Sequence, residues 1–312
     1  MLDRFKIGHF TDLKRATGCT VIVPPEKNMT SAAARGASPG SREYALLSPK
    51  RKISQISALV LTGGSAFGLN CAHGVMEAMV ENGQGYHTNF GLVPIVPAAV
   101  IFDKNIGDAT AYPSAEDGQS ALESAKYNNE EMGSMGVGTG ATVGKWRGMD
   151  FAMKGGLGLA HQNYQNIKVS VLTVVNAVGD VLDKQGRIMA GALSKENVFL
   201  AKDDPFCRWD ESRVGLAENT LLTAIMTNMI LSKQQAHFVA ERAHHGIARR
   251  IEPSHTGYDG DISFVISSQE LEGKVDLLAS LVVSVVEESI LNGIKQADRL
   301  HGVRSWKDLQ NE

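Results

Sequence analysis

The dipeptide Asn219-Thr220, at the head of the apolar run Leu221-Leu222, is where this sequence could make an unusual nucleophile. If the bond between the two residues breaks, Thr220 carries a free α-amine beside its hydroxyl. A threonine hydroxyl needs a base to become a nucleophile, and an α-amine with an ordinary pKa of about 7.7–8.0 is such a base near neutral pH. On its own, the dipeptide is more typical of an ordinary strand.

Asp259 and Asp261 form a second candidate group, because they stand two residues apart at the start of a strand pattern. On an extended segment they point to one side, opposite the face that carries Ile262, Phe264 and Ile266. Two such carboxylates can hold an ammonium group, orient a hydroxyl and raise each other's pKa. The alternative is a solvated turn. A metal site is not expected, since further ligands at a recognisable spacing are missing.

Asn176 follows the apolar run 169–175, so its side chain would project at the edge of a sheet. Its amide N–H groups could donate hydrogen bonds to an oxyanion there, although such an asparagine more often begins a turn.

Lys145 follows the glycine-rich run 136–144 and could lie beside a reacting carbonyl or, alternatively, on the surface. A phosphate-binding loop fits poorly, because Thr139 stands where that pattern needs glycine and Trp146 where it needs serine or threonine.

Two weaker candidates are set aside. Ser65 lies in a GSxxG string rather than the GxSxG of a nucleophile elbow. His237, Glu241 and His245 share one face of an expected helix, but they lack the HExxH order of a zinc site and favour a polar solvated face.

The candidate residues need a layered α/β scaffold. Buried strands are expected at 18–23, 57–62, 169–175, 221–226 and from 262, and helices at 66–81, 232–248 and 275–291. Residues 24–40 are interpreted as a loop rich in small residues, and the irregular, charge-rich stretch 199–217 stands where a cleavable loop would be needed. Strands alternating with one-sided helices indicate sheets covered by helices.

Composition narrows the class of protein. The chain has 312 residues, 43% of them hydrophobic, and a formal charge of −3, so a large core is expected and a nucleic-acid or anionic membrane partner is not. Cys19, Cys71 and Cys207 show no CxxC spacing, which favours a reducing compartment. Because no signal peptide is evident and no segment approaches the length of a membrane span, we expect a cytoplasmic protein.

Several strings, in order over nearly the whole chain, together resemble the P1 peptidases, which include the L-aminopeptidase/D-amidase/D-esterase, the β-aminopeptidases and the nylon-oligomer endohydrolase. They are Arg35-Gly36 with Pro39-Gly40, the runs 61–69, 138–145 and 175–180, Lys154-Gly155-Gly156, Asn219-Thr220 and Asp259-Gly260-Asp261. The resemblance implies a four-layer αββα sandwich related to the N-terminal-nucleophile hydrolases. It also implies a single domain, residues 1–312, self-cleaved into 1–219 and 220–312.

Site roles also follow from the resemblance. Cleavage would fall between Asn219 and Thr220, with Thr220 as nucleophile and its amine as general base. Asp259 and Asp261 match the pair that orients the amine and the hydroxyl, Asn176 matches the oxyanion-stabilising amide, and Lys145 matches a lysine that lines the site.

Two positions depart from the family pattern. Phe102 stands where several members carry a tyrosine, which removes a phenolic donor and could widen an apolar pocket. Leu221 replaces a threonine that often follows the nucleophile. The segments around Thr220, 225–228 and 255–261 are most similar to the nylon-oligomer hydrolase.

These observations predict a self-processing amide hydrolase that acts on a small peptide or amide without a metal or organic cofactor. Family resemblance suggests a homo-oligomer, a tetramer of cleaved protomers. The alternatives are an acyltransferase on the related ornithine acetyltransferase fold and a noncatalytic nucleotide-binding protein that uses residues 133–145.

Overall fold

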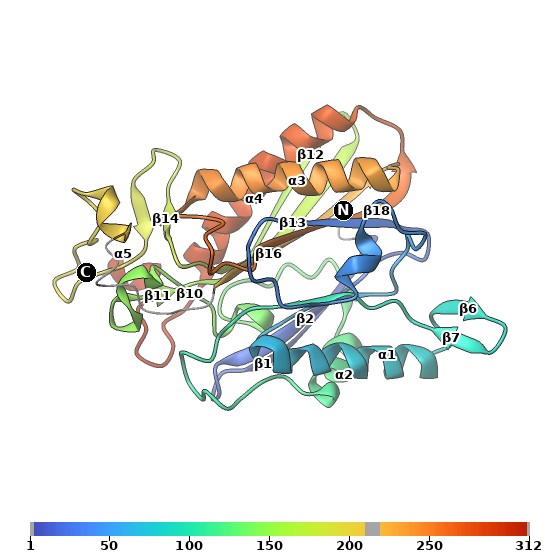
Figure 1. Ribbon diagram of the computed structural model, residues 1–312, viewed down its shortest axis with the longest axis horizontal. Coiled ribbons are helices and arrows are strands. Elements are labelled where there is room, and N and C mark those ends of the chain that lie inside the picture. Colours follow the sequence, from blue (N-terminus) through green and yellow to red (C-terminus); the bar gives the residue numbers. More distant parts are fainter. Residues whose placement is uncertain (1–2, 210–218, 311–312) are drawn as a thin grey trace.

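Two β-sheets lie face to face, and helices cover the outer face of each, in the computed structural model (Figure 1). The structure describes residues 3–209 and 219–310. The expected αββα arrangement is therefore confirmed.

The first sheet has the strand order β4-β8-β5-β2-β1-β9. Its strands are β1 (Lys6–Asp12), β2 (Thr17–Val23), β4 (Ser41–Arg42), β5 (Leu59–Thr62), β8 (Ala98–Val100) and β9 (Lys126–Tyr127). Its outer face is covered by α1 (Cys71–Glu81) and α2 (Ala115–Glu123). The helix expected from residue 66 begins later, because Ser65–Asn70 forms a 3₁₀ helix before α1.

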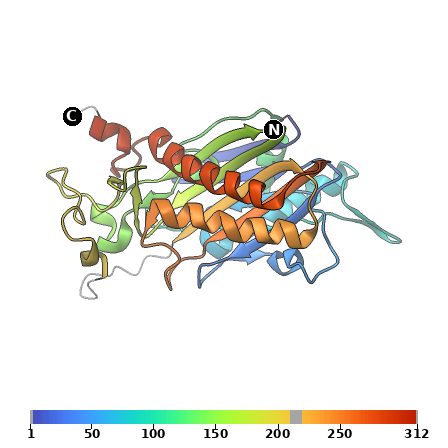
Figure 2. The ribbon, with the colours of Figure 1, turned by 90° about the horizontal axis from the view of Figure 1, so that it is seen from above.

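The second sheet has the order β12-β13-β16-β18-β3 and carries longer strands. These are β12 (Gly156–Tyr164), β13 (Ile167–Asn176), β16 (Thr220–Met229), β18 (Ile262–Leu271) and β3 (Met29–Ala34). Strands β16 and β18 are parallel, and the other neighbouring pairs are antiparallel. Helices α3 (Lys233–Arg250) and α4 (Val275–Gln296) lie side by side over this sheet (Figure 2).

Strand β3 corrects the loop expected over 24–40. The run Met-Thr-Ser-Ala-Ala-Ala has weak intrinsic strand preference. It is extended because it pairs antiparallel with β18 along its whole length and lies beneath α3, where His237 Nδ1 contacts the Ala32 carbonyl oxygen at 2.9 Å. Tertiary pairing outweighs local propensity here.

Strand β16 is buried on both faces, as its sequence predicts. Leu222 and Met226 belong to the apolar core between the two sheets, whereas Leu221 and Ile225 belong to the core beneath α3 and α4. Ile262, Phe264 and Ile266 of β18 all lie in the core between the sheets, which confirms the shared face expected for them.

Smaller elements complete the described part of the chain. They are the hairpin β6 (Tyr86–Thr88) and β7 (Gly91–Val93), the pair β10 (Thr142–Val143) and β11 (Met153–Lys154), the sheet of β14 (Asp180–Leu182), β15 (Ile188–Ala190) and β17 (Ile251–Glu252), and α5 (Trp306–Gln310). The 3₁₀ turns besides Ser65–Asn70 are Tyr44–Leu47, Gly136–Gly138, Lys145–Arg147, Met149–Phe151 and Pro205–Trp209.

Helix α4 corrects one expectation. This 22-residue helix contains an 18-residue window with a mean hydropathy of 1.6 and is long and apolar enough to cross a membrane by length and composition, although no segment of that length was expected. Such a helix is weak evidence for a membrane, because 67% of its apolar window is buried against the rest of the protein. Leu278, Val282 and Val286 belong to the core that it shares with β12, β13 and α3.

Candidate active site

The ends of three strands of the second sheet bring the sequence candidates together. Asn176 ends β13 and lies directly opposite Thr220, which begins the antiparallel neighbour β16. On the other side of β16, the parallel strand β18 begins at Ile262, immediately after Asp261. Thr220 is 6% exposed, and Asn176 and Asp261 are fully buried. The topology thus gathers the Thr220 hydroxyl, the Asn176 amide and the Asp261 carboxylate at one end of the sheet.

The peptide bond before Thr220 is held by two hydrogen-bond donors. The Thr220 hydroxyl donates to the Asn219 carbonyl oxygen at 2.5 Å, and the Gly260 N–H donates to the same oxygen at 2.8 Å. A side chain at position 260 would bring a Cβ within 2.8 Å of Thr220 Oγ1 and 2.9 Å of the Ser38 carbonyl oxygen. Only glycine lets the main chain come this close.

Asp261 is fixed through both of its carboxylate oxygens. Oδ1 accepts a hydrogen bond from the Leu221 N–H at 2.7 Å, and Oδ2 lies 2.8 Å from His255 Nδ1. The main-chain carbonyl of Asp261 accepts from the Arg35 N–H at 3.0 Å. The Asp259-Asp261 segment is thus attached on one side to the strand of the nucleophile and on the other to the Arg35-Gly36 string noted in the sequence.

The pKa values of Asp259 and Lys145 are both shifted toward neutral pH. Burial, reinforced by the charge of Asp261, raises the pKa of Asp259 to about 6, while Lys145 acts in the opposite direction. Burial lowers the pKa of Lys145 to about 7, with Asp259 opposing and Lys154 reinforcing the shift. An acid and a base that both titrate near neutral pH are typical of catalytic sites.

Lys145 also fixes the orientation of the Asn176 amide. Asn176 Oδ1 accepts hydrogen bonds from Lys145 Nζ at 2.8 Å and from the Thr142 N–H at 3.1 Å. Because both partners are donors, the oxygen must face them and the NH₂ group must face away. The NH₂ group donates to the Phe102 carbonyl at 3.2 Å. An amide nitrogen carries two N–H groups, so this contact does not exhaust its donors.

Phe102 therefore touches the site through its main chain, and its side chain is half-buried. The next residue, Asp103, is 2% exposed and accepts hydrogen bonds from the Thr17 hydroxyl and the Gly64 N–H, both at 2.7 Å. Burial raises the pKa of the Asp103 carboxyl, and those two hydrogen bonds lower it. Asp103 thus ties the Phe102 segment to the loop before α1.

The glycine-rich run 136–144 is packed against protein rather than open to a ligand. A Cβ at Gly138 would approach the Leu157 nitrogen to 2.3 Å, and one at Gly140 would approach the Ala16 carbonyl oxygen to 2.2 Å. Lys154, fully buried, donates to the Thr139 and Ala141 carbonyls at 2.8 and 2.7 Å. The run is a scaffold for Lys145.

The candidates set aside from the sequence have other contacts. Glu241 forms an ion pair with Arg35, and the Ser65 N–H donates to the Ile101 carbonyl at 3.0 Å. Within residues 3–209 and 219–310, no group of three or more histidine, cysteine or acidic residues is placed to hold a metal ion.

A model of Peptidase family S58 matches residues 4–307. The chain belongs to peptidase family S58. Peptidases hydrolyse amide bonds, so this family membership places the chain among the amide hydrolases.

Relatives of this S58 chain carry two kinds of name. A relative named as an uncharacterized aminopeptidase, Rv1333 of Mycobacterium tuberculosis, is 32% identical, covering 97% of this chain and 95% of the relative. A 6-aminohexanoate-oligomer endohydrolase of Kocuria sp. is 28% identical, covering 90% and 80% respectively.

Solved structures show the same fold. The L-aminopeptidase D-Ala-esterase/amidase of Ochrobactrum anthropi, described as a variant of the Ntn hydrolase fold, aligns with a TM-score of 0.74 at 17% identity, over 99% of this chain and 91% of that one. A Burkholderia sp. β-aminopeptidase gives a TM-score of 0.72 at 17% identity, over 100% and 93%. The S58 chain has the Ntn-hydrolase fold.

Two contacts of this site were missed from the sequence: the Gly260 N–H on the Asn219 carbonyl and the His255 ring on Asp261. Both residues lie in the 255–261 string, but their roles depend on how that segment turns back toward β16. Nothing in the residue types alone indicated which groups would point at Thr220.

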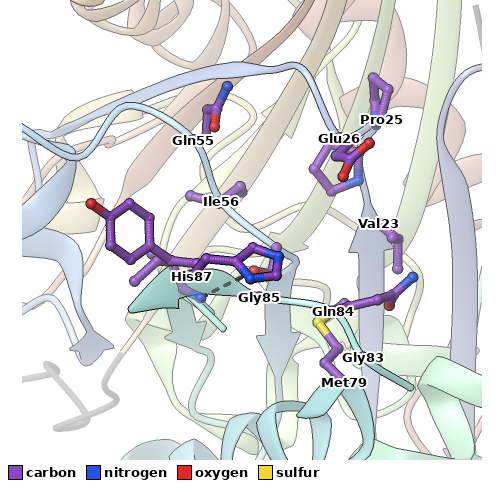
Figure 3. Close-up of a pocket in the computed structure, with 14 residues that line it drawn as sticks. Val23, Pro25, Glu26, Gln55, Ile56, Met79, Gly83, Gln84, Gly85 and His87 are labelled. Carbon is purple, nitrogen blue, oxygen red and sulfur yellow. Dashed lines mark hydrogen bonds between the residues drawn. The ribbon is translucent and has the colours of Figure 1, made fainter. Parts of the chain in front are cut away.

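A cavity of about 510 Å³ lies elsewhere, near the end of β2, the end of α1 and the β6–β7 hairpin (Figure 3). Val23, Ile56 and Met79 are among the residues that line it, and none of Lys145, Asn176, Thr220, Asp259 and Asp261 does.

Proposed function

We propose that this S58 chain is a self-processing amide hydrolase in which Thr220 becomes an N-terminal nucleophile. The observation that carries the proposal is the contact between the Thr220 hydroxyl and the carbonyl of the residue before it, with the Gly260 N–H on the same oxygen. A nucleophile and an oxyanion donor therefore meet at a single peptide bond.

In the proposed maturation step, Thr220 Oγ attacks the carbonyl carbon of Asn219. The hydroxyl proton is transferred to the departing nitrogen, the C–N bond breaks, and the acyl group moves from nitrogen to oxygen as an ester. The Gly260 N–H stabilises the negative oxygen in between. Water then hydrolyses the ester, which leaves the Asn219 carboxylate and a free Thr220 amine.

In the proposed turnover, the new α-amine takes the proton of the Thr220 hydroxyl, and the oxygen attacks the substrate amide. Asn176, oriented by Lys145, donates to the oxyanion, and Asp259 and Asp261 orient the amine. The acyl-enzyme forms as the amine product leaves with the proton, and water then releases the acid. Each step uses residues that lie at the same sheet edge.

The relatives suggest the substrate class. They are named as an uncharacterized aminopeptidase and a 6-aminohexanoate-oligomer endohydrolase, so we propose small peptides or linear oligoamides with a free amine as substrates. The nucleotide-binding alternative is not favoured, because main-chain atoms fill the space beside Gly138 and Gly140 and Lys145 Nζ bonds Asn176.

Intact-mass measurement of the purified protein tests the proposal most directly. Wild-type protein should give two chains that divide between Asn219 and Thr220, and Thr220→Ala should give one intact chain without turnover, because it lacks the attacking oxygen. A panel of amino-acid anilides and aminohexanoate oligomers then measures turnover. A wild-type chain that stays intact for days would overturn self-processing.

A further inference from the structure

His255 is a half-buried titratable group, with a side chain 20% exposed, that the proposed reaction does not use. It lies between β17 and β18, and its φ of 56° is in the left-handed region, where histidine is one of the few residues found more often than average. This backbone conformation lets the segment 255–261 turn the His255 ring back toward Asp261, whose Oδ2 lies 2.8 Å from His255 Nδ1.

The far side of the His255 ring is set by helix α3. His244 packs against it edge to face, with ring centroids 4.9 Å apart. His244 Nε2 lies 2.9 Å from the Ala33 carbonyl, which can only accept, so this nitrogen carries the proton. Burial lowers the pKa of His244 to about 4, so the His244 ring that packs against His255 is neutral at physiological pH.

The charged groups around His255 favour its protonated form. Asp261 and Asp259 face His255 from its own segment, and neutral His244 faces it from α3. Arg35, which follows β3, acts on His244 through its charge. Burial lowers the pKa of His255, but the hydrogen bond and charge of Asp261, the His244 carbonyl and the charge of Asp259 raise it, and the net shift is upward. The protonated form of His255 is therefore favoured beside the two carboxylates.

The geometry points to His255 as a positioning residue for the nucleophile, acting through Asp261; this inference rests on the proposed function. One oxygen of Asp261 is bound to the residue after Thr220 and the other to His255, so His255 decides how the carboxylate is turned. Without His255, Asp261 could rotate away from the strand that carries Thr220, and the two carboxylates would repel each other without the opposing charge of the His255 ring.

Two substitutions separate the hydrogen bond from the charge. His255→Ala removes both, whereas His255→Asn keeps a neutral N–H near the place of Nδ1 and tolerates the left-handed backbone. We expect His255→Ala to lower kcat about 10- to 100-fold, the usual loss for a hydrogen bond to a charged group, with little change in KM. His255→Asn should recover most of kcat.

The pH profile gives a second readout. Both variants lose the positive charge beside Asp259 and Asp261, so the acid limb of kcat/KM should move to higher pH in both. His245→Ala is the matched control, since His245 is exposed on α3 and should leave the profile in place. Unchanged kcat and acid limb in His255→Ala, or equal loss of kcat in both variants, would overturn the inference.

Histidine NMR of the Thr220→Ala chain keeps the inference testable if a position-255 variant fails to fold. His255 should titrate above an ordinary histidine, and Asp261→Asn should lower its pKa; a pKa that does not respond to Asp261→Asn refutes the pairing. Failure of the proposed function reads differently, since the wild type itself would then stay uncleaved and inactive, whatever His255 does.

Discussion

Two buried clusters of charged residues are linked through one turn of the chain. They differ in how many of their polar atoms have hydrogen-bond partners. The first surrounds Thr220. The second is the ion pair of Asp180, at the start of β14, with Arg208, whose side chain is 2% exposed and whose Nε lies 2.8 Å from Asp180 Oδ2. One 3₁₀ turn serves both clusters, because Lys145 bonds Asn176 and the next residue, Trp146, donates to Asp180 Oδ1 at 2.9 Å.

The difference lies in hydrogen-bond saturation. Asp180 also accepts from the Ala192 N–H at 2.9 Å, so both of its oxygens are occupied by donors. Asp259 Oδ2 accepts from the Thr256 N–H at 2.6 Å, but Asp259 Oδ1 is buried without a hydrogen-bond partner in the described part of the chain. Burial alone does not mark a reactive site. The cluster around Thr220, which has a carboxylate oxygen without a partner, can receive an ammonium group or a substrate. The saturated pair of Asp180 and Arg208 serves to stabilise the fold.

The largest effect on stability is expected from breaking the saturated cluster. Arg208→Met leaves Asp180 buried without its cation and should lower the free energy of unfolding by about 3–5 kcal/mol. Urea unfolding in the Thr220→Ala background, where the proposed function predicts an uncut chain, measures this loss. A loss below about 1 kcal/mol, the range of exposed ion pairs, would contradict the interpretation that this pair stabilises the fold.

The next largest effect is expected from Asn176 in the unsaturated cluster. Asn176→Ala removes the proposed oxyanion donor and should lower kcat by about 100- to 1000-fold. Self-cleavage should continue, because the Asn219 carbonyl is contacted by the Gly260 N–H and the Thr220 hydroxyl. Initial rates and intact mass on the same sample separate the two reactions, and full turnover in this variant would remove the role assigned to Asn176.

The smallest effect is expected from Asp259, and its sign is unusual. The pKa of Asp259 rises from 3.8 to about 6 on folding, so its ionisation destabilises the folded chain progressively between these two pH values and fully above about pH 6. Asp259→Asn should therefore stabilise the chain at pH 8 by about 1–2 kcal/mol while turnover falls. The gain should vanish below pH ~4, where the aspartate is protonated in both states. Thermal unfolding at the two pH values checks this; equal gains at both would contradict it.

Much of this comparison could be predicted from the sequence, because local residue patterns indicate where strands begin and end. The apolar runs before Asn176, after Thr220 and after Asp261 predict strands, and adjacent strands bring their ends to one edge. The run Ser232 to Gln235 likewise predicts the capping box that opens α3, and both of its hydrogen bonds are present.

Other features depend on contacts between distant segments. Strand β3 exists because β18 offers it a partner, and Lys145 reaches Asn176 because Gly144, at φ 70°, turns the chain there. Arg208 pairs with Asp180, 28 residues earlier, which no local pattern records. Of the stretch 199–217, expected to hold a cleavable loop, residues 210–217 lie outside the described residues.

The central place of β16 has a consequence for how the mature protein could be rebuilt. A cut at Thr220 divides one sheet between two molecules, since β3, β12 and β13 precede the cut and β16 and β18 follow it. Unfolding would then release two particles, and the unfolding midpoint would depend on protein concentration. Refolding of the cut protein would require two fragments to meet, whereas the newly made, uncut chain would need only to fold on itself. The order of the two events, folding first and cutting second, would therefore matter for this molecule.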